Sequence, residues 1–143
     1  MRVTKGRYKE KHPTALPADP EIARAAQERI VDGMITCADA ATIASDLQNS
    51  MQEIGVVLDI LEVSLAKCQL GLFGYHPVKK IVSPVISVTQ EMETAIRSGL
   101  SNGSLSCAAA WKIAEMLSLP KMNVSSACET MSIKIKPCQL GAF

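Results

Sequence analysis

The amino-acid sequence predicts a mainly helical α+β protein of two tandem repeats, each with three helices and a small β element. Residues 21–73 align without a gap on residues 91–143, with 14 identical pairs among 53 positions. Both copies close on Cys-Gln-Leu-Gly-x-Phe, at Cys68–Phe73 and at Cys138–Phe143. Aromatic residues make up only 3% of the chain, so the core must be aliphatic, and Ala, Leu and Met favour helices. A repeat of this length indicates two small domains rather than a solenoid, whose units span roughly 20–50 residues.

Composition restricts the class of protein. Apolar residues make up 48% of the 143 residues, which is enough for a packed core. No apolar run approaches the roughly 18 residues of a membrane span, and the first residues lack the apolar core of a secretory signal. The odd number of cysteines does not make a complete disulfide framework. We therefore expect a cytoplasmic protein without membrane association.

The charges are unevenly distributed along the chain. The net charge is +3 over residues 1–20, −3 over residues 21–80 and +1 over residues 81–143, so the repeats have no strong electrostatic footprint for nucleic acid. The expected organisation is a flexible basic arm over 1–18, a first repeat over 19–75, a linker over 76–87 and a second repeat over 88–143.

The first helix of each repeat has recognisable end signals. Asp19 is a suitable N-cap, and Pro20 suits the first helical position. Gly33 is expected to end this helix as a C-terminal cap residue, and Gly103 to end its counterpart, which begins at Val88.

The second helix is predicted by a hydroxyl cap and an apolar stripe. Thr36 and Ser106 each follow a short extended piece and can cap the helix after it. Four positions at i, i+3, i+4 and i+7 are identical in the two copies, which predicts a buried face. These positions are Ala40, Ile43, Ala44 and Leu47 in the first copy, and Ala110, Ile113, Ala114 and Leu117 in the second.

The third helix follows a three-residue break. Ser50 and Glu53 form a capping-box pattern in the first copy, while Pro120 suits the first helical position in the second. The expected core faces are Ile54, Val57, Leu58 and Leu61 in one copy, and Val124, Ala127, Cys128 and Met131 in the other.

Each repeat is expected to close on a strand and a bend. Polar and apolar residues alternate over 62–65 and 132–136, as in a half-buried strand. In the repeated motif we expect Gly71 and Gly141 to make a bend, and Leu70 and Phe73 to fold back on the core. The alternative is that this segment forms a tip that contacts a partner.

This order of elements resembles that of winged helix–turn–helix domains, and the residue pattern resembles that family in both copies. An apolar residue followed by Ala, and later apolar residues at the family's spacing, let two short helices cross closely. The matching residues are Ile43-Ala44, Leu47, Ile54 and Val57, and then Ile113-Ala114, Leu117, Val124 and Ala127. The turn departs from the family pattern, because Gln48 and Ser118 occupy a position that is usually Gly.

The resemblance implies a DNA-binding regulatory protein whose second motif helix enters the major groove. Copy one is acidic on that helix and would be repelled by phosphate, so the footprint should be dominated by copy two and the arm. The candidate nucleic-acid-binding residues are Lys121, Asn123, Ser125, Ser126, Gln52, Lys134, Lys136, Arg2 and Arg7. The alternative is a protein-interaction module on the same fold, and a homodimer also stays open. The absence of a catalytic motif, with only His12 and His76 as histidines, argues against an enzyme and implies no cofactor.

Four cysteines are repeated, which makes them a second candidate site. Cys37 and Cys107 stand at the start of the second helix, while Cys68 and Cys138 follow the last strand. In the winged-helix layout that the resemblance implies, the strand before Cys37 pairs with the strand before Cys68, which would bring the two cysteines of a repeat close together. Three interpretations stay open: small buried hydrophobes, a metal or iron–sulfur site without the compact C-x₂-C spacing, and a redox switch.

Overall fold

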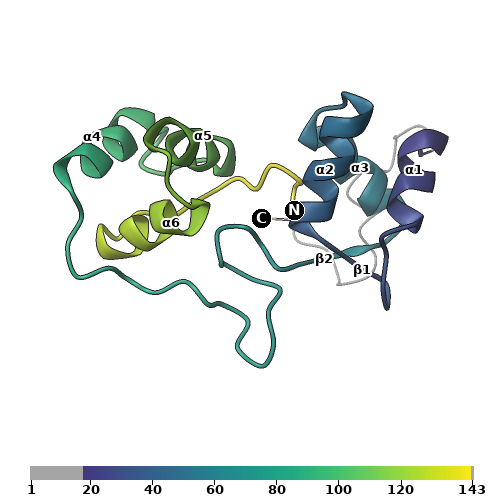
Figure 1. Ribbon diagram of the computed structural model, residues 1–143, viewed down its shortest axis with the longest axis horizontal. Helices are drawn as coiled ribbons and strands as arrows, with labels where there is room; N and C mark the ends of the chain where they lie inside the picture. The colour runs from purple at the N-terminus through teal and green to yellow at the C-terminus, as the bar shows by residue number, and fades with distance from the viewer. Residues whose placement is uncertain (1–17, 143) are drawn as a thin grey trace. The chain divides into compact units, whose positions relative to one another are not determined.

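The computed structural model describes residues 18–142, which form two compact units (Figure 1). Unit 1 contains residues 18–68 together with Leu140–Ala142, and unit 2 contains Gln69–Gln139. The Leu-Gly pair near the end of each repeat (Leu70-Gly71 and Leu140-Gly141) therefore belongs to the unit formed by the other repeat. No helix in the described part is long and apolar enough to cross a membrane. The predicted basic arm, with Arg2 and Arg7, lies outside the described residues.

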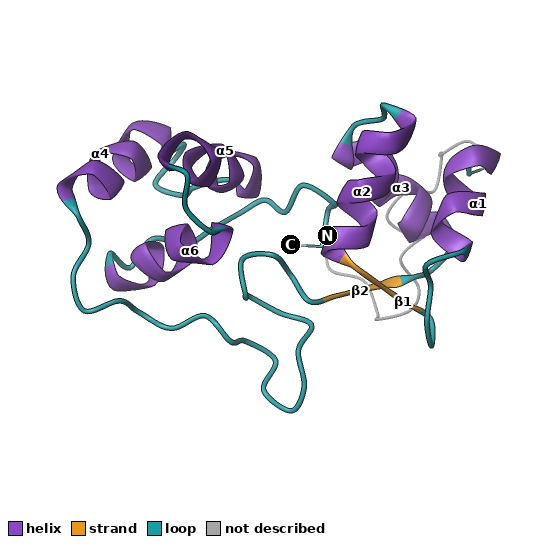
Figure 2. Cartoon of the chain, in the orientation of Figure 1, coloured by secondary structure: helices purple, strands orange, loops and turns teal. Residues whose placement is uncertain are grey.

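Unit 1 is a three-helix cluster with a short parallel sheet (Figure 2). Helix α1 packs on α2 and α3, and α2 packs on α3. Strands β1 and β2 pair with Ile35 opposite Leu65, which confirms that the strand before Cys37 pairs with the strand before Cys68. The elements are α1 (Pro20–Gln27), β1 (Met34–Thr36), α2 (Cys37–Leu47), α3 (Met51–Ile60) and β2 (Ser64–Ala66). The largest fully buried side chains are those of Ile22, Ile35, Ile43, Ile54 and Leu58.

Unit 2 repeats this arrangement with a smaller β element. Its helices are α4 (Gln90–Gly99), α5 (Cys107–Leu117) and α6 (Lys121–Thr130). A single parallel bridge joins Leu105 to Ile135, with Leu105 N–H donating to the Lys134 carbonyl at 3.0 Å. The predicted strand over 132–136 is thus reduced to a bridge. Within residues 18–142, the chain after the third helix forms one strand (β2) in unit 1 and only the bridge at Ile135 in unit 2. The β element of each unit is therefore smaller than the antiparallel hairpin of a wing. The mainly helical α+β prediction is confirmed at this level.

The pattern of buried and exposed positions is the same in the two repeats over their first two helices. Residues 21–48 and 91–118 have the same order of buried, half-buried and exposed positions. The Ala-Ile-Ala part of the predicted stripe on α2 and α5 is buried in both copies. Its fourth member, Leu47 or Leu117, is only half-buried because it lies in the last turn, next to the interhelical turn.

The ends of the first helices differ from the sequence prediction. Helix α1 ends at Gln27, well before Gly33, so Gly33 is not its cap. Asp32 and Gly33 instead have φ values of 52° and 74°, and Val31 bridges Met34 across them. Asn102-Gly103 repeats this geometry after α4. Asp-Gly and Asn-Gly favour the two-residue hairpin turn with two positive φ values, which explains both glycines better than a helix cap does.

The predicted caps of the second helices are present. Thr36 Oγ1 accepts from the Asp39 N–H at 3.1 Å, and Ser106 Oγ accepts from the Ala109 N–H at 3.0 Å. Each hydroxyl satisfies an N–H group that has no partner within the helix.

The third helices begin differently in the two copies. Ser50 and Glu53 form both hydrogen bonds of a capping box. The Ser50 N–H, and then the Asn49 side chain, lower the pKa of Glu53 by stabilising its carboxylate. In unit 2, Pro120 is the N-cap rather than the first helical residue, and α6 has no side-chain cap.

The interhelical turn takes the left-handed conformation without glycine. Gln48 has a φ of 56° and Ser118 a φ of 54°. Both turns therefore take a conformation that usually requires glycine, although neither has a glycine at this position. A Cβ in this region is sterically unfavourable, so each turn carries a local cost.

Glycine at this turn is expected to stabilise the protein. Gln48→Gly should raise the free energy of unfolding by up to about 1 kcal/mol, because it removes the Cβ penalty of the left-handed conformation. Ser45→Gly is the control, since Ser45 is exposed inside α2. It should lower the free energy of unfolding by roughly 0.5 kcal/mol, because glycine is less favourable than serine inside a helix. Urea unfolding of both variants measures the difference, and an equal loss in the two would contradict the left-handed geometry at Gln48.

Candidate nucleic-acid interface

The candidate residues of unit 2 lie at the start of α6 and beside the parallel bridge. Lys121 is the first residue of α6 and is half-buried, while Asn123 in the same turn is exposed. Ser126 is half-buried one turn later. Lys134 and Lys136 flank the bridged Ile135 and are both exposed. The side chains of Asn123 and the two lysines are thus accessible to a partner.

Ser125 does not belong to this exposed set. Its side chain is only 1% exposed, and its hydroxyl donates to the Leu70 carbonyl at 2.6 Å. The Met122 carbonyl is a second acceptor within reach, at 3.1 Å. Ser125 lies on the buried face of α6, together with Val124, Ala127 and Cys128. Its side chain is therefore not available to a base edge. We therefore do not include Ser125 in the proposed interface.

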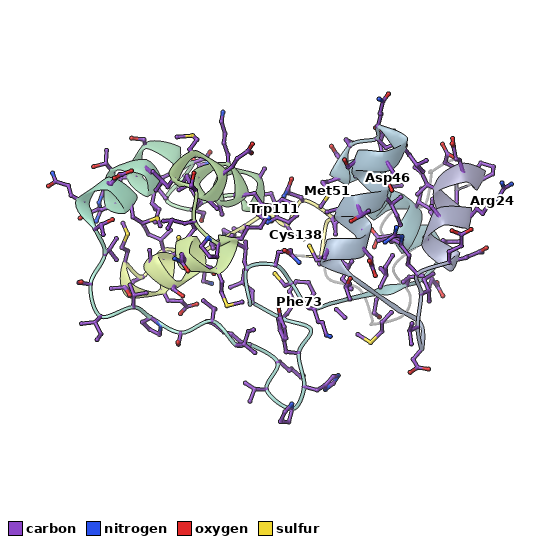
Figure 3. The ribbon with its side chains drawn as sticks, viewed as in Figure 1. Arg24, Asp46, Met51, Phe73, Trp111 and Cys138 are labelled. Carbon is purple, nitrogen blue, oxygen red and sulfur yellow. The ribbon has the colours of Figure 1, made fainter. Side chains whose placement is uncertain are left out.

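A lysine–tryptophan contact fixes the start of α6. Trp111 lies on α5 (Figure 3). The Nζ of Lys121 lies 4.7 Å from the centroid of its ring. Such a cation–π contact contributes roughly 0.5–1 kcal/mol at an accessible site and holds the ammonium group over the ring. The indole Nε1 of Trp111 is buried and has no hydrogen-bond partner among the described residues. Sequence reasoning did not select Trp111, although it is the chain's single tryptophan and replaces Ala41 of the first copy.

The two units differ strongly in charge. Unit 2 has seven basic and four acidic side chains, a net charge of +3. Two of its basic residues pair with carboxylates, Lys80 with Glu129 and Arg97 with Glu93. The described part of unit 1 has three basic and nine acidic side chains, a net charge of −6. Only unit 2 has the sign that attracts phosphate.

In unit 1 the helix equivalent to α6 is α3, which carries the candidate Gln52. Gln52 is exposed and follows Met51, the first residue of α3 (Figure 3). Its neighbour Glu53 is committed to the capping box. Gly55 and Asp59 of the same helix are buried. Neither residue therefore belongs to the exposed surface of α3, and the helix has no basic side chain.

The repeated cysteines lie where the sequence places them. Cys37 and Cys107 are the first residues of α2 and α5 and are buried. Cys68 is buried and Cys138 is half-buried. The segment around Cys138 contacts Cys107 on both sides: the Pro137 carbonyl accepts from the Cys107 N–H at 3.1 Å, and Gln139 Nε2 approaches Cys107 Sγ at 3.6 Å. None of these thiols forms a disulfide.

The fifth cysteine, Cys128, has the character of a core residue. It is 1% exposed on α6 at the position of Leu58 in the first copy. Burial, followed by the charge of Glu129, raises the pKa of its thiol to about 11. The thiol therefore stays protonated at neutral pH, and its reactivity is low.

The described residues do not assemble a metal centre. Within residues 18–142, no group of three or more His, Cys, Asp or Glu side chains is placed to hold a metal ion. The cysteines of each repeat come from two segments, a helix start and the segment after a third helix, and the structure does not add a third ligand to either pair.

Comparison with protein-family models, with curated proteins and with solved structures finds no match to this chain.

Proposed function

We propose that the protein is a DNA-binding regulator that contacts DNA through unit 2, with α6 as the helix presented to the major groove. One observation carries this proposal: the exposed Asn123 lies in the first turn of α6, directly after the left-handed turn at Ser118, in a unit of net charge +3. An Asn side chain suits bidentate contact with adenine in the major groove. Helix–turn–helix proteins use the N-terminal residues of the second motif helix for such contacts.

Phosphate contacts in this proposal come from Lys121, Lys134 and Lys136. The Trp111 ring restrains the Lys121 ammonium group at the start of α6, so less side-chain entropy is lost when it meets a phosphate. Lys134 and Lys136 are exposed on either side of Ile135. The net charge of −6 on the described part of unit 1 opposes phosphate binding there, so we propose an asymmetric footprint.

Binding of the full chain to labelled duplex DNA, measured against salt concentration, tests the proposal. Three lysine–phosphate contacts predict that log K falls with log salt at a slope of about −3. Lys121→Ala should reduce that slope by about 1, whereas Asn123→Ala should leave it unchanged and weaken binding to a selected site by about 1–3 kcal/mol.

The control is Gln27→Ala, which removes an exposed polar side chain from α1 of unit 1. It should leave affinity and slope unchanged. Absence of binding, or binding that does not respond to salt, contradicts the proposal and directs attention to protein partners.

The second candidate function is a protein-interaction module, and unit 1 favours it. The described residues of unit 1, 18–68 and 140–142, carry a net charge of −6, which suits a basic protein surface better than nucleic acid. In unit 2, Met116 and Leu119 beside the interhelical turn are 63% and 39% exposed, and apolar side chains of this kind suit a protein partner. The same salt titration separates the two functions.

A further inference from the structure

The closing segments of the two repeats are seated on third helices that come from the other repeat. Leu70 is fully buried in unit 2, where its carbonyl accepts the hydrogen bond from Ser125 of α6. Leu140 is 3% exposed in unit 1, where it meets Gly55 of α3. Leu70 and Leu140 are equivalent in the repeat, and so are Gly55 and Ser125. Each unit therefore holds a Leu-Gly segment at the same helical position. We call this position, Gly55 on α3 or Ser125 on α6, the seat of the segment.

The seat in unit 1 depends on the absence of a side chain at Gly55. A Cβ added there would lie 2.2 Å from the Leu140 carbonyl oxygen, 2.7 Å from its carbonyl carbon and 2.9 Å from its Cα. The backbone of the segment therefore lies directly on the backbone of α3. Only glycine allows this approach, although glycine is unfavourable inside a helix by roughly 0.5–1 kcal/mol relative to alanine.

The seat in unit 2 holds the same segment by different contacts. Besides the Ser125 hydrogen bond, the Gly71 carbonyl accepts from the N–H groups of Ile81 and Val82 at 2.9 and 3.1 Å. Gly71 has a φ of 74°, and a Cβ there would be about as close as 3.1 Å to the Met122 sulfur. Both seats thus recognise a buried leucine followed by a glycine in the left-handed region, since Gly141 has a φ of 82°.

We propose that the Gly55 seat of unit 1 is a binding site for the Leu-Gly segment, and that a second copy of this chain can supply that segment. The segment Leu140–Ala142 contains no helix or strand, and it follows Gln139 of unit 2 directly in the chain. Exchange of an identical element between copies of a protein is a low-cost route to dimers. The proposed occupant has the same sequence as the segment already seated, so the seat needs no new complementarity.

Competition within the chain sets the conditions for this exchange. A segment joined by a short connection has an effective concentration on the order of mM. The chain's own segment therefore keeps the seat at µM concentrations, and a second copy occupies it once that competition is removed. This proposal does not depend on DNA binding.

Two full-length variants remove the competition. Gly55→Leu blocks the seat and keeps the segment, whereas Leu140→Asp disables the segment and keeps the seat. Neither variant alone can form the intermolecular contact. A 1:1 mixture should form a heterodimer by light scattering, and the double variant should not. A mixture that stays monomeric at several hundred µM (below the mM range of tethered segments) overturns the proposal.

A peptide measurement covers the case in which either variant folds poorly. A synthetic peptide with the sequence of residues 134–143 is added to the Leu140→Asp chain, and hydrogen exchange of the amides in α1, α2 and α3 is followed. At a hundredfold excess over its dissociation constant, the peptide should slow exchange about a hundredfold. A control peptide with Asp at the position of Leu140 should have no effect. Equal exchange with both peptides overturns the proposal.

Discussion

Truncation of Leu70 to alanine is expected to destabilise unit 2 by about 3 kcal/mol, although Leu70 belongs to the first repeat in sequence. The side chain is 0% exposed, and removal of a fully buried leucine side chain costs roughly 2–5 kcal/mol. Trp111, the single tryptophan, lies on α5 of unit 2, so its fluorescence in urea reports the unfolding of that unit. The expected result is a lower urea midpoint of the Trp111 transition.

Leu140→Ala is the matched control, because it changes the same residue of the same motif. It should leave the Trp111 transition close to that of the wild type and instead raise the exchange rates of amides in α1, α2 and α3. The reverse assignment, with Leu70→Ala loosening α1–α3, would show that each segment stays with its own repeat.

Gly55→Ala is the second change with a large expected effect. We expect it to destabilise unit 1, although alanine has a higher helix propensity than glycine. Alanine would gain roughly 0.5–1 kcal/mol from the helix itself. Its Cβ would meet the Leu140 backbone, which cannot move aside as the end of a side chain can. Overpacking of this kind costs typically 1–3 kcal/mol, so we expect a net loss of stability in unit 1 by hydrogen exchange.

Gly99→Ala is the control for the glycine change. Gly99 is the last residue of α4, and a Cβ there would be nearest to the Leu105 Cδ1, at 3.1 Å. That methyl group is the end of a flexible side chain and can shift by a few tenths of an ångström. Gly99→Ala should therefore be neutral or slightly stabilising. Equal effects of the two substitutions would mean that the Leu140 backbone does not lie on α3.

Local and periodic features of the sequence were sufficient to predict most elements. The Thr36 and Ser106 caps, the Ser50–Glu53 capping box and the Ala-Ile-Ala stripe are all present because each depends on residues within a few positions of one another. The pairing of β1 with β2 was expected from the winged-helix layout that the resemblance implies, and no local pattern of residues predicts it.

The errors at the ends of α1 and α4 have a local cause that the sequence did contain. Asp32-Gly33 and Asn102-Gly103 are favourable two-residue hairpin dipeptides, and this preference outweighs that of glycine for a helix C-terminus. A test for Asp-Gly and Asn-Gly before a short strand would have found both turns.

The burial of Ser125, and the placement of each Leu-Gly pair in the unit of the other repeat, depend on contacts between residues far apart in sequence. Ser125 was included among the expected nucleic-acid-binding residues because of its position on the second motif helix, yet its hydroxyl is satisfied by a carbonyl 55 residues away along the chain. Nothing near Ser125 in sequence identifies that partner. For the same reason, the repeat shows that Cys-Gln-Leu-Gly is constrained but not which third helix receives it.

Because each unit contains the Leu-Gly pair of the other repeat, the order of synthesis determines which unit can reach its final packing first. A ribosome adds roughly 5–20 residues per second and usually lets the first domain fold before the second is made. Here unit 1 includes Leu140–Ala142, so its α3 stays without its leucine until the whole of unit 2 has been translated. Unit 2 receives Leu70 before its own helices exist. The repeat that is synthesised first is therefore the last to reach its final packing.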